Sequence, residues 1–149
     1  MTKEYEKIEQ AYISMIQERG IECITRKKLC DRLDIDTDTF RDTVPMTFHA
    51  FKQKISLRYF LDIAMCFSII DGYDSITLEQ IGEGSKTKTN TIRKYFGSVQ
   101  NLRCRVLLHA IEKQNVQIIV AAIGKGDPLV SDISIELREK VCDYIRKQL

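Results

Sequence analysis

The chain has 149 residues and a formal net charge of +2 at pH 7, with 44% apolar and 30% charged residues. This length allows one large domain or two small ones, and the composition is typical of a globular protein. The first residues lack a charged-then-apolar signal segment, and the longest apolar run, residues 59–70, is too short to span a bilayer. We therefore expect a soluble, cytoplasmic protein without a membrane partner.

Only seven glycines and two prolines interrupt the chain, so long stretches of helix-forming residues remain. This pattern predicts an all-α fold with almost no strand. The cysteines are odd in number and widely spaced, and none forms a Cys-x-x-Cys motif, which argues against a disulfide framework and a zinc site. They are Cys23, Cys30, Cys66, Cys104 and Cys142. We expect reduced thiols that are mostly buried.

The N-terminal part of the chain reads as three helices. Residues 4–19 carry apolar side chains at helical spacing, and Gly20 ends this helix. Thr25 can cap a second helix, and a third, short helix covers about residues 37–43. The residues of these two helices that should face inward are Leu29, Leu33, Phe40 and Val44. The second helix turns three basic side chains to solvent: Arg26, Lys27 and Lys28.

The stretch from Thr47 to Ile70 contains no glycine or proline, so we expect one continuous helix there. The run is apolar nearly all round, which is typical of a helix covered on several sides. Its apolar residues should form the centre of the core: Phe60, Ile63, Ala64, Phe67 and Ile70.

Residues 77–102 read as a helix, a tight turn and a second helix. Thr77 and Gln80 have the spacing of a capping box, and small residues follow at Gly82 and Gly84, where two helices would touch. The turn should cover residues 85–87, and the next helix should run from about residue 88 or 89 to Tyr95. The residues that should face inward are Leu78, Ile81, Ile92 and Phe96.

The second of these helices leaves a basic and polar surface exposed. A helix, a tight turn and a second, basic helix are typical of a DNA-binding helix-turn-helix, in which the second helix is the recognition helix. Residues at the start of a recognition helix reach base edges, while their neighbours contact phosphates. Asparagine amides pair with adenine and arginine guanidinium groups with guanine. The candidate base readers are therefore Asn90, Thr91 and Arg93. The candidate phosphate contacts are Lys86, Lys88, Thr89, Lys94, Arg103 and Arg105.

Residues 60–107 resemble the DNA-binding domain of the TetR family of bacterial regulators. The matching residues are Ala64, Phe67, Gly72-Tyr73, Thr77, Ile81-Gly82, Tyr95-Phe96-Gly97-Ser98 and Leu102. The chain departs from the family at residues 85–87 and at Arg93. The resemblance implies that the helix after the turn enters the major groove, and that Tyr95 approaches the DNA backbone.

The N-terminal segment repeats this pattern. A shift of 52 positions places Gly20 on Gly72, Thr25 on Thr77 and Arg41 on Arg93. Because capping, core and turn positions recur together, we expect two tandem tri-helical helix-turn-helix units, residues 1–55 and 56–102.

The two copies differ in charge. The first has acidic residues where the second is basic or polar: Asp34, Asp36, Asp38 and Asp42. Carboxylates repel phosphates, so we assign DNA reading to the second copy. Three roles remain open for the first copy: a structural duplicate with a solvated acidic face, a surface for a basic protein partner, or an accessory DNA contact through Arg26, Lys27 and Lys28.

Residues 103–149 should form a C-terminal helical hairpin. A helix should extend from Leu102 to about Ile123, and Asp127 with Pro128 should begin the last helix. An apolar stripe follows at Leu129, Ile133, Leu137, Val141, Ile145 and Leu149. A stripe of this kind favours pairing into a four-helix homodimer, as the TetR resemblance also implies. Too few residues remain for the family's ligand-binding domain, so we expect no small-molecule effector.

Catalytic and metal motifs are missing from the sequence. His49 and His109 lie far apart without metal-ligand spacing, and residues 82–86 lack the spacing of a phosphate loop. We therefore expect no enzyme, no cofactor and no metal site. The favoured function is a sequence-specific double-stranded DNA-binding transcriptional regulator, most simply a dimeric repressor. The alternative is a helical protein-interaction or assembly factor, such as the DNA-recognition subunit of a viral or plasmid complex.

Overall fold

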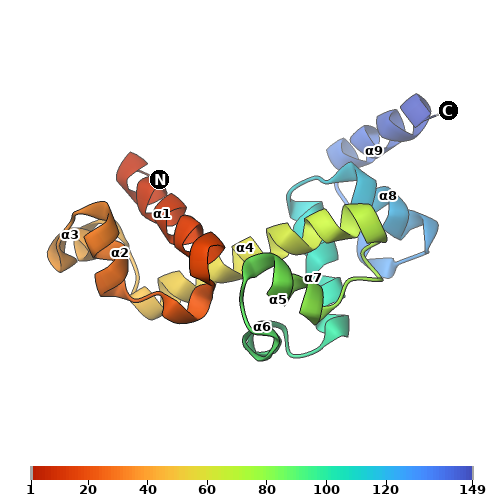
Figure 1. The fold of residues 1–149 in the computed structure, drawn as a ribbon. Coiled ribbons are helices and arrows are strands. Elements are labelled where there is room, and N and C mark those ends of the chain that lie inside the picture. The colour runs from red at the N-terminus through yellow and green to blue at the C-terminus, as the bar shows by residue number, and fades with distance from the viewer. Residues whose placement is uncertain (1, 149) are drawn as a thin grey trace. The chain divides into compact units, whose positions relative to one another are not determined.

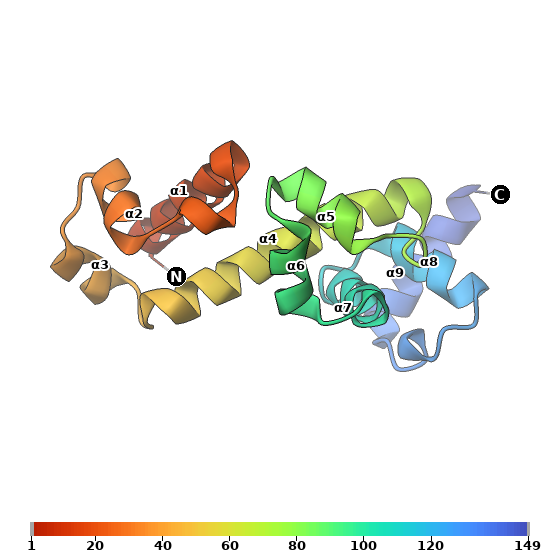
Figure 2. The same cartoon turned by 60° about the horizontal axis from the view of Figure 1, so that its bottom comes forward.

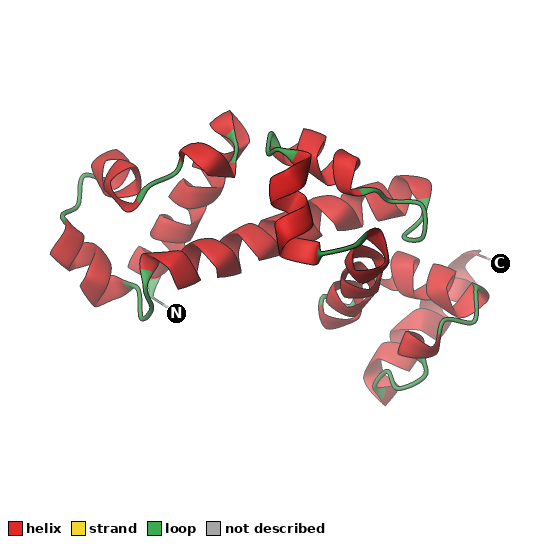
Figure 3. Cartoon of the chain, turned by 90° about the horizontal axis from the view of Figure 1, so that it is seen from below, coloured by secondary structure: helices red, strands yellow, loops and turns green. Residues whose placement is uncertain are grey.

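The computed structural model describes residues 2–148, which form helices and loops without any strand. This confirms the all-α prediction (Figures 1 and 3). The α-helices are α1 (Lys3–Arg19), α2 (Arg26–Leu33), α3 (Thr37–Thr43), α4 (Phe48–Asp71), α5 (Leu78–Ser85), α6 (Thr89–Phe96), α7 (Val99–Glu112), α8 (Val116–Gly124) and α9 (Ile135–Gln148). Two short 3-10 turns are η1 (Ile21–Cys23) and η2 (Pro128–Val130).

The helices form two compact units. The first unit contains the residues up to Phe60 together with Ile81–Tyr95, and the second contains Leu61–Gln80 together with the residues from Phe96 onward. The first unit is therefore discontinuous in sequence, because it includes most of the predicted helix-turn-helix as well as α1–α3. The expected division into residues 1–55, 56–102 and 103–149 is based on repeats rather than contacts, and it stays a prediction.

The predicted end of α1 and the predicted cap of α2 are confirmed, and α3 has a cap that was not predicted. Gly20 ends α1 with φ at +82°, a left-handed conformation that glycine adopts without steric cost. The Thr25 hydroxyl accepts a hydrogen bond from the Lys28 amide, and the Asp36 carboxylate accepts one from the Thr39 amide. These bonds satisfy amides that a helix start leaves without partners.

The core of the first unit is rich in aromatic rings. Phe51 of α4 is fully buried, and its ring lies 5.4 Å from that of Tyr12 and 5.9 Å from that of Phe40, both edge to face. Edge-to-face pairs of this kind stabilise a core beyond their buried area. Aliphatic side chains from the N-terminal helices and α4 complete the cluster: Ile8, Ile16, Leu29 and Ile55.

Helix α4 is continuous, as predicted, but its last turn is not core. Phe60 and Ala64 are fully buried, whereas Ile70 is 78% exposed, so its predicted core position is wrong. The buried face near this end follows Ala64 and Ser68. Ile70 lies two residues beyond Ser68, which turns its side chain to the opposite face at 100° per residue. Among the described residues no helix is both long and apolar enough to cross a membrane.

The C-terminal region departs from the predicted two-helix hairpin. The expected helix from Leu102 to Ile123 is broken between α7 and α8, where Gln114 has φ at +57° and the Asn115 side chain accepts a hydrogen bond from the Ile118 amide. Asp127 caps η2 instead of the last helix. Helix α9 begins eight positions later, where the Ser134 hydroxyl accepts from the Leu137 amide.

The predicted apolar stripe is confirmed in its middle part. Ile133, Leu137 and Val141 are buried with Ile119 of α8 in one cluster of the second unit. Ile145 is 40% exposed, and Leu149 lies outside the described residues. A second cluster of this unit joins Tyr73 to α7 and α8, and the Tyr73 hydroxyl donates to the Asp127 carboxylate at 3.0 Å.

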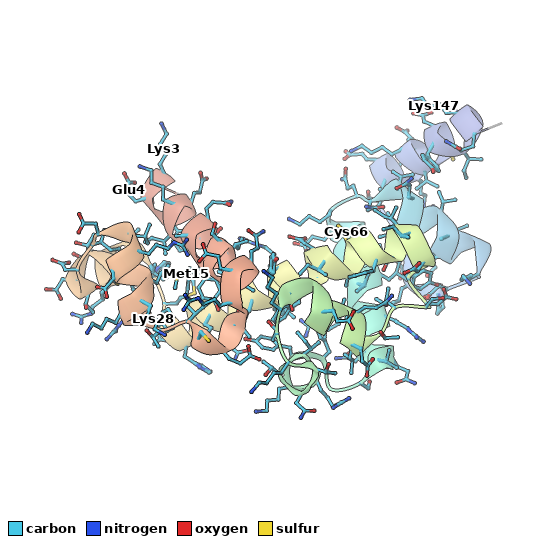
Figure 4. All side chains as sticks on the ribbon, viewed as in Figure 1. Lys3, Glu4, Met15, Lys28, Cys66 and Lys147 are labelled. Atoms are coloured by element: carbon cyan, nitrogen blue, oxygen red, sulfur yellow. The ribbon has the colours of Figure 1, made fainter. Side chains whose placement is uncertain are left out.

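The expectation of mostly buried cysteines is wrong. Cys30 is buried, but the other four thiols are exposed, including Cys66 on α4 (Figure 4). Each of the four lies on a polar or solvent-facing side of its element, which hydropathy alone does not identify. His109, by contrast, is buried in the second unit, with its Nε2 atom 2.8 Å from the Asp62 carboxylate.

Candidate nucleic-acid interface

The predicted helix-turn-helix forms α5, a turn and α6 (Figure 2). Thr77 and Gln80 make both hydrogen bonds of the predicted capping box, at 3.2 and 2.9 Å. Gly82 is needed for space, because a Cβ atom there would lie 2.8 Å from the Thr87 carbonyl oxygen. This close contact joins the end of α5 to the loop that leads into α6.

The turn lies one residue later than predicted, at residues 86–88, because Ser85 still belongs to α5. Lys86 adopts φ of +56°, and the Lys86 and Thr87 amides donate to the Glu83 and Gly82 carbonyls. These two bonds define a Schellman motif, which ends a helix with a left-handed residue. The Ser85 hydroxyl donates back to the Ile81 carbonyl at 2.7 Å, so this buried polar group has a partner.

Helix α6 presents the base-reading candidates in two different environments. Ile92 and Phe96 are buried as predicted, which leaves Asn90 and Arg93 exposed. The Arg93 guanidinium donates to the Asn90 side-chain oxygen at 2.9 Å, so the structure brings these two candidates together. Thr91 is half-buried, and its hydroxyl donates to the Glu22 carboxylate at 3.1 Å.

The candidate phosphate contacts also divide into two groups. Lys86, Lys88 and Lys94 are exposed, and Thr89 is half-exposed at the start of α6. In the second unit, the Arg103 guanidinium donates twice to the Ile76 carbonyl, each at 3.1 Å, and Arg105 lies 5.9 Å from the centre of the Phe96 ring. These two arginines therefore have protein partners, which the sequence did not predict.

Tyr95, the remaining phosphate candidate, is half-buried against α4. Its ring lies 5.1 Å from that of Phe60, edge to face. Burial raises the pKa of its hydroxyl, and a hydrogen bond with Ser56 opposes this shift. The proposed accessory contacts Arg26, Lys27 and Lys28 are all exposed on α2. The Lys28 ammonium donates to the Cys23 carbonyl at 3.1 Å.

A segment at the end of α1 holds the turn before α6. A Cβ atom on Gly20 would lie 2.0 Å from the Lys86 carbonyl oxygen, so only glycine permits this approach. The Ile21 amide donates to the Thr87 hydroxyl at 3.4 Å, and the Glu22 carboxylate accepts from the Lys88 amide at 2.9 Å. Glu22 thus satisfies backbone at the start of α6.

Sequence reasoning missed this role of Glu22, because 66 residues separate it from Lys88 and no local pattern marks the contact. Burial raises the pKa of the Glu22 carboxyl, but hydrogen bonds from the Lys88 and Glu22 amides and from Thr91 outweigh burial and hold the pKa below its ordinary value. Glu22 is therefore a charged acceptor at neutral pH.

Replacing Glu22 with alanine is expected to speed hydrogen exchange of the Lys88 amide by at least about tenfold, because a hydrogen bond to a charged acceptor contributes about 1.5–3 kcal/mol. Nuclear magnetic resonance measures this exchange rate at single amides. Glu83→Ala on the exposed side of α5 is the matched control and should leave the Lys88 amide unchanged. Equal exchange in both variants would contradict the role assigned to Glu22.

The two copies of the predicted repeat have matching elements. When the sequence is shifted by 52 positions, the bounds of α2 align with those of α5, and the start of α3 aligns with the start of α6. Asp34 and Lys86, which this shift pairs, both end their helices in a left-handed conformation, with φ of +54° and +56°. The pair formed by Arg93 and Asn90 also has a counterpart, since Arg41 lies 3.4 Å from the Asp38 carboxylate.

No protein-family model matches the sequence, and comparison with curated proteins and with solved structures found no significant match.

Proposed function

We propose that this protein binds double-stranded DNA sequence-specifically through α5 and α6, as a TetR-like transcriptional regulator, most simply a repressor. The observation that carries the proposal is the exposed pair of Asn90 and Arg93 on α6, directly after the close turn from α5. An asparagine amide can read adenine and an arginine fork can read guanine in the major groove. Their mutual hydrogen bond orders both side chains before DNA arrives, which lowers the entropic cost of binding.

The charges around this pair favour a nucleic acid over a neutral partner. Lys86, Lys88 and Lys94 lie close to the pair in sequence with exposed side chains, and residues 84–96 contain no acidic residue. The Glu22 carboxylate at the start of α6 offsets part of this positive charge. Each lysine that neutralises a phosphate releases a condensed counterion, so DNA binding should weaken steeply as salt rises.

The counterpart pair in the first copy supports assigning DNA reading to the second. Arg41 is paired with the carboxylate of Asp38, where Arg93 is paired with a neutral amide. A carboxylate beside an arginine cancels part of its positive charge, so the pair attracts DNA phosphates more weakly. The carboxylate itself also repels phosphate. We propose that the first copy is a structural duplicate with a solvated acidic face.

We further propose a homodimer formed through residues 103–149. Ile135 and Ile145 of α9 are exposed apolar side chains in this region, and covering them would stabilise an interface. A two-fold dimer would present two copies of α6 to a near-palindromic site.

The test is selection of bound sequences from a pool of random duplexes, followed by variants of the pair. Asn90→Ala or Arg93→Ala should relax base preference at one position and cost about 1–3 kcal/mol of binding free energy. Lys88→Ala should weaken binding to all sequences alike. The matched control is Arg41→Ala, at the equivalent position of α3, which should leave selection unchanged.

If the pool yields no enriched sequence and binding is absent at low salt, the basic surface of α6 docks a protein instead. The protein would then be a helical assembly factor, the second candidate function. The exposed acidic side chains Asp34, Asp38 and Asp42 of the first copy favour such a role, because they suit a basic partner. The number of chains in solution separates the two readings, since a dimer favours the regulator and a ring favours an assembly.

A further inference from the structure

A hollow of about 320 Å³ opens in the first unit beside α6. Side chains from η1, α4 and α6 line it, among them Glu22, His49, Lys52, Gln53, Lys94 and Tyr95. Its volume is at the lower end of the range for sites that hold small ligands. The hollow does not include Asn90 or Arg93, but Lys94, which lines it, directly follows Arg93 on α6.

Lys52 is the unusual group in this hollow. Its side chain is half-buried, and its ammonium donates to the Ile24 carbonyl at 3.2 Å. Within the described residues of the first unit no carboxylate forms an ion pair with it. Burial lowers the pKa of Lys52, although Glu22 and Cys23 oppose the shift. An ammonium group that is partly removed from water, and that has N–H donors beyond the one bonded to Ile24, is stabilised by an anion.

The other charges of the hollow also favour an anion. Lys94 adds a second ammonium, while the single carboxylate, that of Glu22, already accepts from the Lys88 amide and the Thr91 hydroxyl. His49 and Gln53 each carry at least one N–H donor. The hollow therefore gathers donors from two helices around a space with a net positive charge.

We propose that this hollow binds a phosphate group. A phosphate has several strong acceptor oxygens, which donors from separate elements can share, whereas a carboxylate has two. The phosphate could belong to the backbone of DNA, in which case the inference rests on the proposed function and extends the DNA contact to α4. It could also belong to a free phosphate-bearing molecule, which would compete with DNA for Lys94.

The first arm of the test uses inorganic phosphate without DNA. Amide spectra of the full chain are recorded during a phosphate titration, with sodium chloride at equal ionic strength as the reference. Saturable shifts of the Gln53 and Tyr95 amides are expected if the ligand is free phosphate. Lys52→Met, which keeps the aliphatic part of the side chain, should weaken this binding at least about tenfold. Lys52→Arg should retain it and show that the fold tolerates substitution there.

The second arm uses duplex DNA and its salt dependence. If a backbone phosphate occupies the hollow, Lys52→Met should reduce the slope of log affinity against log salt by about one. Lys54→Met is the matched control in both arms, because Lys54 is an exposed lysine of the same helix that lines a different hollow. It should change neither phosphate binding nor the salt slope.

Loss in Lys52→Met but not in Lys54→Met, in either arm, supports the proposal and identifies the source of the phosphate. Equal behaviour of the two variants in both arms overturns it. If DNA binding persists and depends on Lys88 while neither arm responds to Lys52→Met, the inference fails and the proposed function stands. If the chain binds phosphate through Lys52 but no DNA, the proposed function fails and the inference stands.

Discussion

Gly20→Ala is expected to destabilise the first unit by about 3 kcal/mol. Two costs add. The residue has φ at +82°, which strains any side chain, and the new Cβ atom would lie 2.0 Å from the Lys86 carbonyl oxygen. Backbone cannot move aside as a flexible side chain can, so residues 20–22 and 86–88 would have to separate. Urea denaturation followed by circular dichroism measures the loss.

Gly97→Ala separates the two costs. Gly97 has nearly the same φ, +79°, but a Cβ atom there would meet no atom within 4 Å. This variant should lose only the cost of the left-handed backbone, about 1 kcal/mol. If the two alanine variants were equally stable, the close approach of Gly20 to Lys86 would not contribute to stability.

Phe51→Ala is expected to cost about 3–5 kcal/mol of unfolding free energy, the range for truncating a fully buried aromatic side chain. Phe51 is 0% exposed, and its ring packs edge to face against Tyr12 and Phe40. Removing it leaves a cavity that three helices border, and none of them can move in alone. Thermal and urea unfolding would both report the change.

Ile70→Ala is the matched control for Phe51→Ala, because it also shortens an apolar side chain of α4. Ile70 is 78% exposed, so its truncation should change the unfolding free energy by no more than about 0.5 kcal/mol. A large loss of unfolding free energy in Ile70→Ala would indicate that another surface covers this side chain in solution.

The parts of the fold that could be predicted are those decided within a few residues. Thr25 and the pair of Thr77 and Gln80 cap helices through bonds to amides three residues away, so their spacing in sequence carries the information. The break before α8 was missed because its left-handed residue is Gln114, and neither glycine nor proline marks it. Ile70 was misassigned because a run that is apolar on every side gives no direction.

The candidate interface divides in the same way. The exposed face of α6 followed from the helical spacing of Ile92 and Phe96, which are both buried. The bonds of Glu22 to Lys88 and Thr91, and the hollow around Lys52, depend on contacts between distant segments. Periodicity within one helix carries no information about which distant helix will pack against it.

The discontinuous first unit has a consequence for synthesis on the ribosome. Its N-terminal helices emerge first, but the segment that Gly20 and Glu22 hold, residues 86–91, comes later, and the unit is complete only at Tyr95. Domains of a growing chain generally fold as units, N-terminal ones first. Here α1–α3 are synthesised before Ile81–Tyr95, the later part of the same unit. The side of these helices that packs against that part therefore stays exposed while residues 61–80 are made. A nascent chain whose first 60 residues have emerged from the ribosome should therefore be cut more readily by a protease than one whose first 95 residues have emerged.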